Sequence, residues 1–215
     1  MKRTLHIETW ARREHYLFFK DFDEPFFGVN LRVDCTGAYQ ASKRQGHSFF
    51  LSYLHKALQA ANETEAFRIR IENDEVVIFD RINASPTVGR PDGTFAFSYM
   101  QYHPDFEVFA AAGQAEIDRV RSSSGLCLGD EKPDVIHFSS VPWIDFNGIA
   151  HARHFSLRDS VPKITFGKMI ESGGRKSMPL AIHAHHGLMD AWHVGLFLER
   201  FEELMSPRLR QGFGG

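Results

Sequence analysis

The hydrophobic pattern of this chain changes period across one histidine-rich segment near the C-terminus. Residues 180–185 (Leu-Ala-Ile-His-Ala-His) come directly after a proline, and we predict a strand there. From Asp190 onward the apolar residues recur at helical spacing, and Pro207 is expected to end that helix. His185 and His186 lie between the two elements, at a predicted strand–turn–helix junction. A side chain at the end of a rigid strand has its geometry fixed before any ligand arrives.

Elsewhere, strand and helix patterns follow one another irregularly. Strict alternation over residues 67–72, then Asn73-Asp74 and the apolar run 76–79, predicts a hairpin. Further strands are expected over residues 29–34, 93–99, 132–139 and 161–169. Helices are expected over residues 9–21 (with Thr9 as N-cap), 48–62 and 105–121. Because no regular βαβ period is present, we predict an α/β fold, a two-layer sandwich with a mixed sheet, in a single domain over residues 1–215.

The composition narrows the class of protein further. Hydrophobic residues make up 43% of the 215 residues, which is enough for one substantial core. The formal net charge of −2 gives no basic excess, so no nucleic-acid partner is expected. No apolar stretch approaches about 18 residues, so no membrane span is expected, and the N-terminus lacks the apolar run of a signal peptide. Two cysteines, Cys35 and Cys127, are too few for a disulfide framework and favour a reducing cytoplasm.

Three interpretations of the histidine-rich segment compete. On a strand, His183 and His185 share one face while His186 points to the other, and Asp190 and His193 are neighbours on the following helix. The histidines could simply be hydrogen-bonded polar residues at a sheet end. They could also bind a metal, although neither a His-Glu-x-x-His spacing nor a cysteine pair is present. The third interpretation is acyl transfer with His186 as general base, because histidine takes up a proton near neutral pH.

The run from His185 to Asp190 resembles the His-His-x-x-x-Asp active-site motif of the chloramphenicol acetyltransferase family. The resemblance extends in order and approximate spacing from Trp10 to Met205, nearly the whole chain. The other matching segments are Trp10-Ala11-Arg12-Arg13-Glu14-His15-Tyr16, Ser139-Ser140-Val141-Pro142-Trp143-Ile144-Asp145-Phe146 and Met178-Pro179-Leu180-Ala181-Ile182.

The resemblance implies an acetyl-CoA-dependent O-acetyltransferase that transfers the acetyl group directly, without an acyl-enzyme. His186 would deprotonate the acceptor hydroxyl, and Ser139 would donate a hydrogen bond to the oxyanion. Asp190 would pair with Arg12 and so fix the loop that carries the histidine. The alternatives are a solvated helix face for Arg12 and a backbone-bonded hydroxyl at a strand end for Ser139.

The same resemblance implies a cofactor site and an assembly. Trp143 would line the CoA channel, with simple core packing as the alternative, and Thr165 would hold an active-site water. Acetyl-CoA would be the co-substrate, and no metal is implied. The family is trimeric, so a homotrimer with active sites at subunit interfaces is expected, and a role in antibiotic resistance is implied.

The acceptor side departs from the family pattern. Phe19, Phe27 and Phe95 match aromatic residues of the family's acceptor pocket, whereas His151 and Arg153 stand where aliphatic side chains are usual. Charged groups beside an apolar acceptor are costly unless they are paired. We therefore expect an acceptor more polar than chloramphenicol, unless these side chains point to solvent. The rival hypothesis is a non-catalytic ligand-binding protein that retains the fold.

Overall fold

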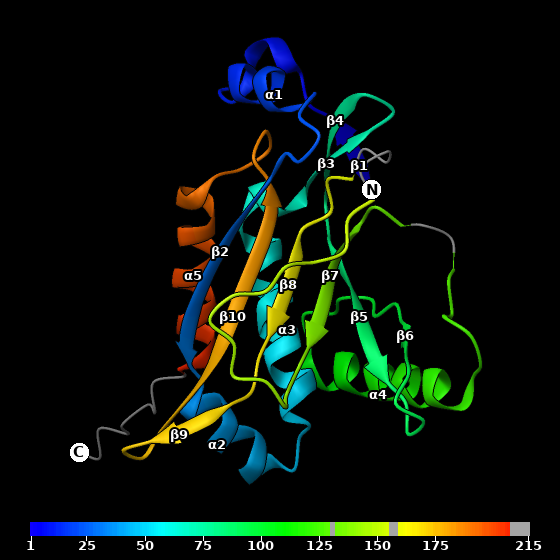
Figure 1. Ribbon diagram of the computed structural model, residues 1–215, viewed down its shortest axis with the longest axis vertical. Coiled ribbons are helices and arrows are strands. Elements are labelled where there is room, and N and C mark those ends of the chain that lie inside the picture. Colours follow the sequence, from blue (N-terminus) through cyan, green and yellow to red (C-terminus); the bar gives the residue numbers. More distant parts are fainter. Residues whose placement is uncertain (130–131, 155–158, 207–215) are drawn as a thin grey trace.

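A mixed sheet of seven strands forms the centre of the protein (Figure 1). The computed structural model describes residues 1–129, 132–154 and 159–206, and its strand order is β2-β10-β8-β7-β5-β6, with β9 paired to β10. β5, β7 and β8 run parallel, and the other pairings are antiparallel. The strands are β2 (Phe26–Asp34), β5 (Asn83–Gly89), β6 (Phe95–Phe97), β7 (Val135–Ser140), β8 (Lys163–Phe166), β9 (Ile170–Ser172) and β10 (Arg175–His185). The prediction of a mixed sheet is confirmed.

Helices cover one face of this sheet, because the apolar residues of its strands alternate toward that side. Along β10, Leu180, Ile182 and Ala184 belong to the main apolar core, while Ala181 and His183 point to the opposite face. The helices around this core are α2 (Thr36–Gln45), α3 (Phe49–Glu63), α4 (Phe106–Ser122) and α5 (Ala191–Met205). The predicted two-layer sandwich is therefore confirmed. No helix within the described residues is both long and apolar enough to span a membrane.

A small second sheet and the helix α1 lie beyond the end of the main sheet at which β10 terminates (Figure 1). β3 and β4 form the predicted hairpin, and Asn73 and Asp74 at its turn have φ angles of 50° and 63°. The elements of this region are β1 (Lys2–Thr4), β3 (Ile69–Glu72), β4 (Glu75–Phe79), α1 (Arg13–Phe19) and two short 3-10 helices, η1 (Ile7–Thr9) and η2 (Glu65–Arg68).

The fully buried Arg70 ties the small sheet to β7. Its guanidinium donates to the carbonyl oxygens of Pro133 at 2.9 Å, Val135 at 2.6 Å, Phe67 at 2.9 Å and Ile69 at 2.7 Å. A buried guanidinium needs all of these acceptors to replace the water that it has lost. The bonds to Pro133 and Val135 fix the start of β7, the strand that carries Ser139.

The first helix is shorter than the predicted helix over residues 9–21, and Thr9 is not its N-cap. The chain forms a 3-10 turn up to Thr9, Trp10 is extended, and α1 begins only at Arg13. The Thr9 hydroxyl donates to the carbonyl of His6 at 3.2 Å. Trp10 packs on the apolar cluster around Leu188, and this tertiary contact outweighs the local helical pattern.

The strand before the histidine-rich segment is longer than predicted and contains Pro179. Its pairing with β9 ends at Ser177, and its pairing with β8 begins at Leu180. Pro179 falls between these two ladders, and its carbonyl oxygen accepts from the backbone N–H of Gly167 at 2.9 Å, so the strand continues through the proline. The prediction of a strand that starts only after this proline was therefore wrong.

The two longest elements that were absent from the sequence prediction are α2 and β5. α2 contains Gly37 and buries only Ala38 and Ser42, so its apolar stripe is too narrow to be read as a helix face. β5 carries Pro86 in a largely polar sequence, so the sequence pattern did not predict a strand there. Pro207, the predicted end of the last helix, lies outside the described residues.

We predict that Arg70→Met lowers the free energy of unfolding by about 3–5 kcal/mol, because it leaves four buried carbonyl groups without their cationic donor. Urea unfolding followed by circular dichroism measures the change. Arg121→Met, at an exposed position of α4, is the control and should stay within about 0.5 kcal/mol of the wild type. Equal stabilities of the two variants would contradict the anchoring role of Arg70.

Candidate active site

His186 follows the last residue of β10 and contacts two phenylalanine rings. Its imidazole stacks on Phe19 with ring centroids 4.4 Å apart and lies 4.8 Å from the ring of Phe27. Nδ1 of His186 is 3.3 Å from the carbonyl oxygen of Met189. Because a carbonyl oxygen only accepts, this contact favours the tautomer with hydrogen on Nδ1 and leaves the lone pair of Nε2 available. We call His186, the predicted general base, together with Phe19 and Phe27 the base half-site.

Arg12 and Asp190 support this half-site from opposite ends of the chain. Arg12 Nη1 lies 2.6 Å from Asp190 Oδ2, and Arg12 Nη2 donates to the carbonyl oxygen of His186 at 2.9 Å. The guanidinium therefore holds both the turn that carries His186 and the carboxylate that starts α5. The predicted pairing of Arg12 with Asp190 is present, and Arg12 is buried, so it does not lie on a solvated helix face.

Asp190 is also the N-cap of α5. Its Oδ1 accepts from the backbone N–H of Trp192 at 3.0 Å and lies 2.9 Å from Nδ1 of His193. Burial raises the pKa of Asp190, but the hydrogen bonds from Arg12 and His193 and their charges outweigh it. The pKa of the carboxyl group is therefore held well below its usual range, and the group stays ionised near neutral pH.

Ser139 and Thr165 form a second group on the sheet face opposite the helices. Ser139 on β7 pairs in register with Thr165 on β8, and Thr165 pairs with Ala181 on β10. The fully buried Thr165 hydroxyl lies 3.2 Å from Nε2 of His151. The Ser139 side chain makes no hydrogen bond to any residue that the structure describes. We call Ser139, Thr165 and His151 the sheet half-site.

One chain does not bring the two half-sites together. Ala181 lies beside Thr165, and His186 is five residues further along the same strand direction. At about 3.3 Å per strand residue, the row of Ser139 and Thr165 is roughly 16 Å from His186. Such a separation is too large for a proton acceptor and an oxyanion donor to act on one reacting group.

His151 and Arg153 lie over the sheet, so the alternative that they point to solvent is disfavoured. The segment that carries them crosses the sheet on the side away from the helices (Figure 1). The ring of His151 contacts that of His183 edge to face, with centroids 4.9 Å apart. The guanidinium of Arg153 lies 3.4 Å from the ring centroid of Phe26, and its Nη1 lies 3.4 Å from Oε1 of Glu24.

Trp143 and Phe95 lie apart from the base half-site. The side chain of Trp143 is 70% exposed just beyond the end of β7, which rules out the alternative of core packing. Phe95 lies on β6 at the edge of the sheet and is half exposed. Three strands separate β6 from β10, so Phe95 does not reach His186 of the same chain.

The sequence analysis missed two ionisable residues beside the sheet half-site, His137 and Lys163. They precede Ser139 and Thr165 by two residues and therefore share their face of the sheet. Burial lowers the pKa of His137 to about 4, and Lys163 adds to the effect. Strand alternation counted back from Ser139 and Thr165 leads to both residues once the pairing of β7 with β8 is known.

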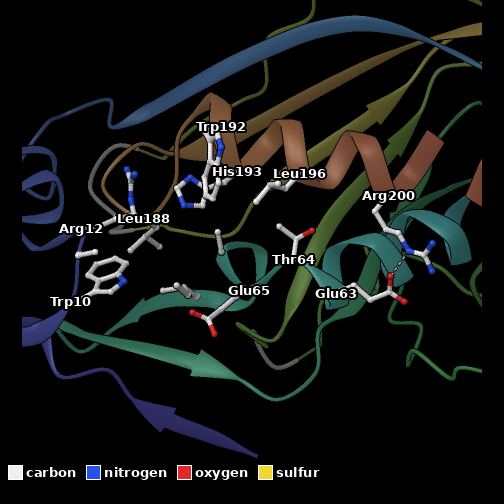
Figure 2. A pocket seen from close by; sticks show the side chains of 13 residues that line it. Trp10, Arg12, Glu63, Thr64, Glu65, Leu188, Trp192, His193, Leu196 and Arg200 are labelled. Atoms are coloured by element: carbon white, nitrogen blue, oxygen red, sulfur yellow. Dashed lines mark hydrogen bonds and ion pairs between the residues drawn. The ribbon is translucent and has the colours of Figure 1, made fainter. Parts of the chain in front are cut away.

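A separate cavity of about 560 Å³ is lined by α5, by the end of α3 and by the segment that carries Trp10 and Arg12. Trp10, Arg12 and His193 line it near the start of α5, as Figure 2 shows. His186 and Ser139 are not among its lining residues. Among the described residues, no group of three or more His, Cys, Asp or Glu side chains is arranged to hold a metal ion.

The sequence is similar to one family along almost its whole length. The family model described as chloramphenicol acetyltransferase matches residues 2–202. Chloramphenicol acetyltransferase 3 of Escherichia coli is 25% identical over 207 residues, which cover 95% of this chain and 97% of that protein. A chloramphenicol acetyltransferase of Staphylococcus aureus is 26% identical over 208 residues, covering 93% of this chain and 94% of that protein.

Solved structures agree with the sequence comparisons. A chloramphenicol acetyltransferase structure superposes with a TM-score of 0.89 at 33% identity, covering 95% of this chain and 100% of that chain. A truncated catalytic core of the 2-oxoacid dehydrogenase complex from Thermoplasma acidophilum shares the fold, with a TM-score of 0.66 at 17% identity over 89% of this chain and 92% of that chain. The chain therefore belongs to the chloramphenicol acetyltransferase family and is an acyltransferase.

Proposed function

We propose that this protein is an acetyl-CoA-dependent O-acetyltransferase in which His186 is the general base. The observation that carries the proposal is the fixed imidazole. The contact between Nδ1 and the carbonyl of Met189, together with the stacking on Phe19, leaves Nε2 as the free basic atom. A base whose position and tautomer are set in advance needs no rearrangement when the substrate binds.

Acetyl-CoA supplies the acetyl group as a thioester. Nε2 of His186 takes the proton of the acceptor hydroxyl as the acceptor oxygen bonds to the thioester carbonyl carbon. The carbon–sulfur bond then breaks, and His186 returns the proton to the departing sulfur. Ser139 donates a hydrogen bond to the carbonyl oxygen on which negative charge develops. Asp190 and Arg12 act through His186 as positioning residues, because they hold its backbone and not the reacting atoms.

The separation of the half-sites supports a shared active site. One chain carries His186 and Ser139 on different surfaces, so a complete site requires two copies in head-to-tail contact. A contact of this kind closes into a ring when the rotation allows it, and the family resemblance implies three subunits. We therefore propose a homotrimer in which the base half-site of one subunit faces the sheet half-site of its neighbour.

The exposed end of β7 suits the CoA side of the site. Trp143 offers an exposed indole four residues after Ser139, within reach of the pantetheine arm of a thioester bound there. Thr165 would hold an active-site water through its hydroxyl, as the family resemblance implies. The proposal also includes a cytoplasmic location, where the free thiols of Cys35 and Cys127 stay reduced. It further includes an acceptor more polar than chloramphenicol. If chloramphenicol is still acetylated, the protein also has a role in antibiotic resistance.

We predict that His186→Ala abolishes acetyl transfer and that Ser139→Ala lowers kcat by about 10²–10³-fold, because each removes one of the two groups that act on the reacting atoms. Release of free thiol from acetyl-CoA in the presence of a hydroxyl acceptor measures the rate. Thermal unfolding and CoA binding of His186→Ala should match the wild type. Transfer by His186→Ala at the wild-type rate would contradict the base assignment. CoA binding with no transfer by the wild type to any hydroxyl compound would instead favour a non-catalytic binding protein.

Co-expression of the two variants tests the shared site. In randomly mixed trimers, about one quarter of the interfaces combine an intact His186 with an intact Ser139 from the neighbour. Activity of the mixed assembly should therefore rise to about a quarter of the wild-type value, well above either variant alone. Activity that never exceeds the average of the two separate variants would contradict a site built from two subunits.

The proposed structural role of Asp190 predicts a pH dependence of stability. A carboxyl group whose pKa is depressed in the folded protein stabilises it above the unfolded pKa of about 3.9 and loses this contribution as the pH falls. The stability gap between the wild type and Asp190→Asn should therefore be widest above about pH 5 and narrow toward about pH 2. Urea unfolding across this range measures the gap, with Glu202→Gln on an exposed position of α5 as the control. A gap that does not change with pH would contradict the role.

A further inference from the structure

A row of ionisable side chains runs beside the sheet half-site. His137 on β7, Lys163 on β8 and His183 on β10 are cross-strand neighbours in register. They lie two residues along their strands from Ser139 and Thr165, on the same face of the sheet. Any acceptor that reaches Ser139 from this side must therefore contact polar groups of the row.

The full charges over this face are already compensated within the protein. Nζ of Lys163 lies 2.5 Å from Oδ2 of Asp159, and Arg153 pairs with Glu24. Each cation also lies over the ring of Phe26, which further reduces its need for an external anion. A charged acceptor would find no unpaired counter-charge among these groups.

The imidazoles on this face, in contrast, keep hydrogen-bonding capacity to spare. A neutral imidazole has one donor and one acceptor nitrogen, and burial lowers the pKa of His137 and His151 to about 4, so both are neutral near pH 7. The ring of His183 lies over Gly28, where a Cβ atom would come within 2.7 Å of its Cδ2. Nδ1 of His183 is buried and has no partner among the described residues.

These contacts favour one chemical class of acceptor. An apolar aromatic group laid on this face would cover the imidazole nitrogens without satisfying them, which is costly for buried polar atoms. An ionic group would gain no free counter-charge and would lose its hydration. Hydroxyl groups can both donate and accept, so they can pair with a ring nitrogen whether it carries a hydrogen or a lone pair.

Resting on the proposed O-acetyltransferase function, we infer that the acceptor is an uncharged polyhydroxyl compound, a sugar or a polyol, held over Ser139 by His137, His151 and His183. His151 is the residue that sets the preference, because its ring contacts both the buried Thr165 hydroxyl and the His183 ring. An aliphatic side chain at this position would remove the polar contact nearest to Thr165.

The test compares acceptors in the full-length enzyme with acetyl-CoA as donor. The acceptors are methyl glycosides of the common hexoses, linear polyols, a hexose phosphate, an amino sugar and chloramphenicol. The best neutral glycoside or polyol should have a higher kcat/KM than chloramphenicol and than either charged sugar. A higher kcat/KM for chloramphenicol, for the phosphate or for the amino sugar would overturn the inference and leave the acetyltransferase proposal standing. Absence of transfer to every acceptor would overturn both.

Variants of residue 151 test the assignment within one fold. His151→Leu should lower kcat/KM for the best neutral acceptor roughly tenfold to a hundredfold and raise the value for chloramphenicol, whereas His151→Gln, which keeps a donor and an acceptor, should retain most of the preference. His154→Leu, at an exposed position on the same segment, is the matched control and should leave the ratio unchanged. Thermal unfolding checks that His151→Leu is folded. An unchanged ratio in a folded His151→Leu enzyme would overturn the role of this residue.

Discussion

Strand alternation divides the central sheet into two surfaces with opposite chemistry, and the rest of the molecule follows from that division. Leu180, Ile182 and Ala184 of β10 point to the helices and complete an apolar core. His183 and its neighbours on β8 and β7 point to the other side, where none of the described helices covers them. A polar face that is partly buried beneath a single crossing segment suits contact with another subunit and with a polar substrate better than it suits further core packing.

The turn between β10 and α5 lies outside both the sheet and the helix. Its backbone therefore has to be held by side chains from elsewhere in the chain. Arg12 supplies this support with two bonds of its guanidinium, one to the backbone of His186 and one to Asp190. Asp190 is at the same time the N-cap of α5, so one carboxylate fixes the start of the helix and the end of the turn. The N-terminal helix thereby becomes part of the site although it precedes the motif by more than half of the chain.

The parts that could be predicted from the sequence are those in which local pattern and tertiary contact agree. The hairpin of β3 and β4, helix α3 with its Ser48 cap and the start of α5 at Asp190 all follow their local periodicity. Thr9 failed as a cap because packing of Trp10 holds the backbone extended, and α2 was missed because only a narrow part of its surface is buried. The pairing of Arg12 with Asp190 came from family resemblance, since no local rule links residues 178 positions apart. His137 and Lys163 were within reach of strand alternation, but only once the partners of Ser139 and Thr165 in the sheet are known.

The distance between the two half-sites has a consequence for specificity. The groups around His186 are aromatic rings and a guanidinium fork, and in the part of the chain that the structure describes they form no ring contact or hydrogen bond with His137, Lys163 or His183. Substitutions on the sheet face can therefore alter the contacts above Ser139 without disturbing the tautomer or the position of His186. A chain built in this way can keep the proton-transfer geometry of its family while the chemistry of the acceptor changes. The paired charges and neutral imidazoles on the sheet face fit such a change.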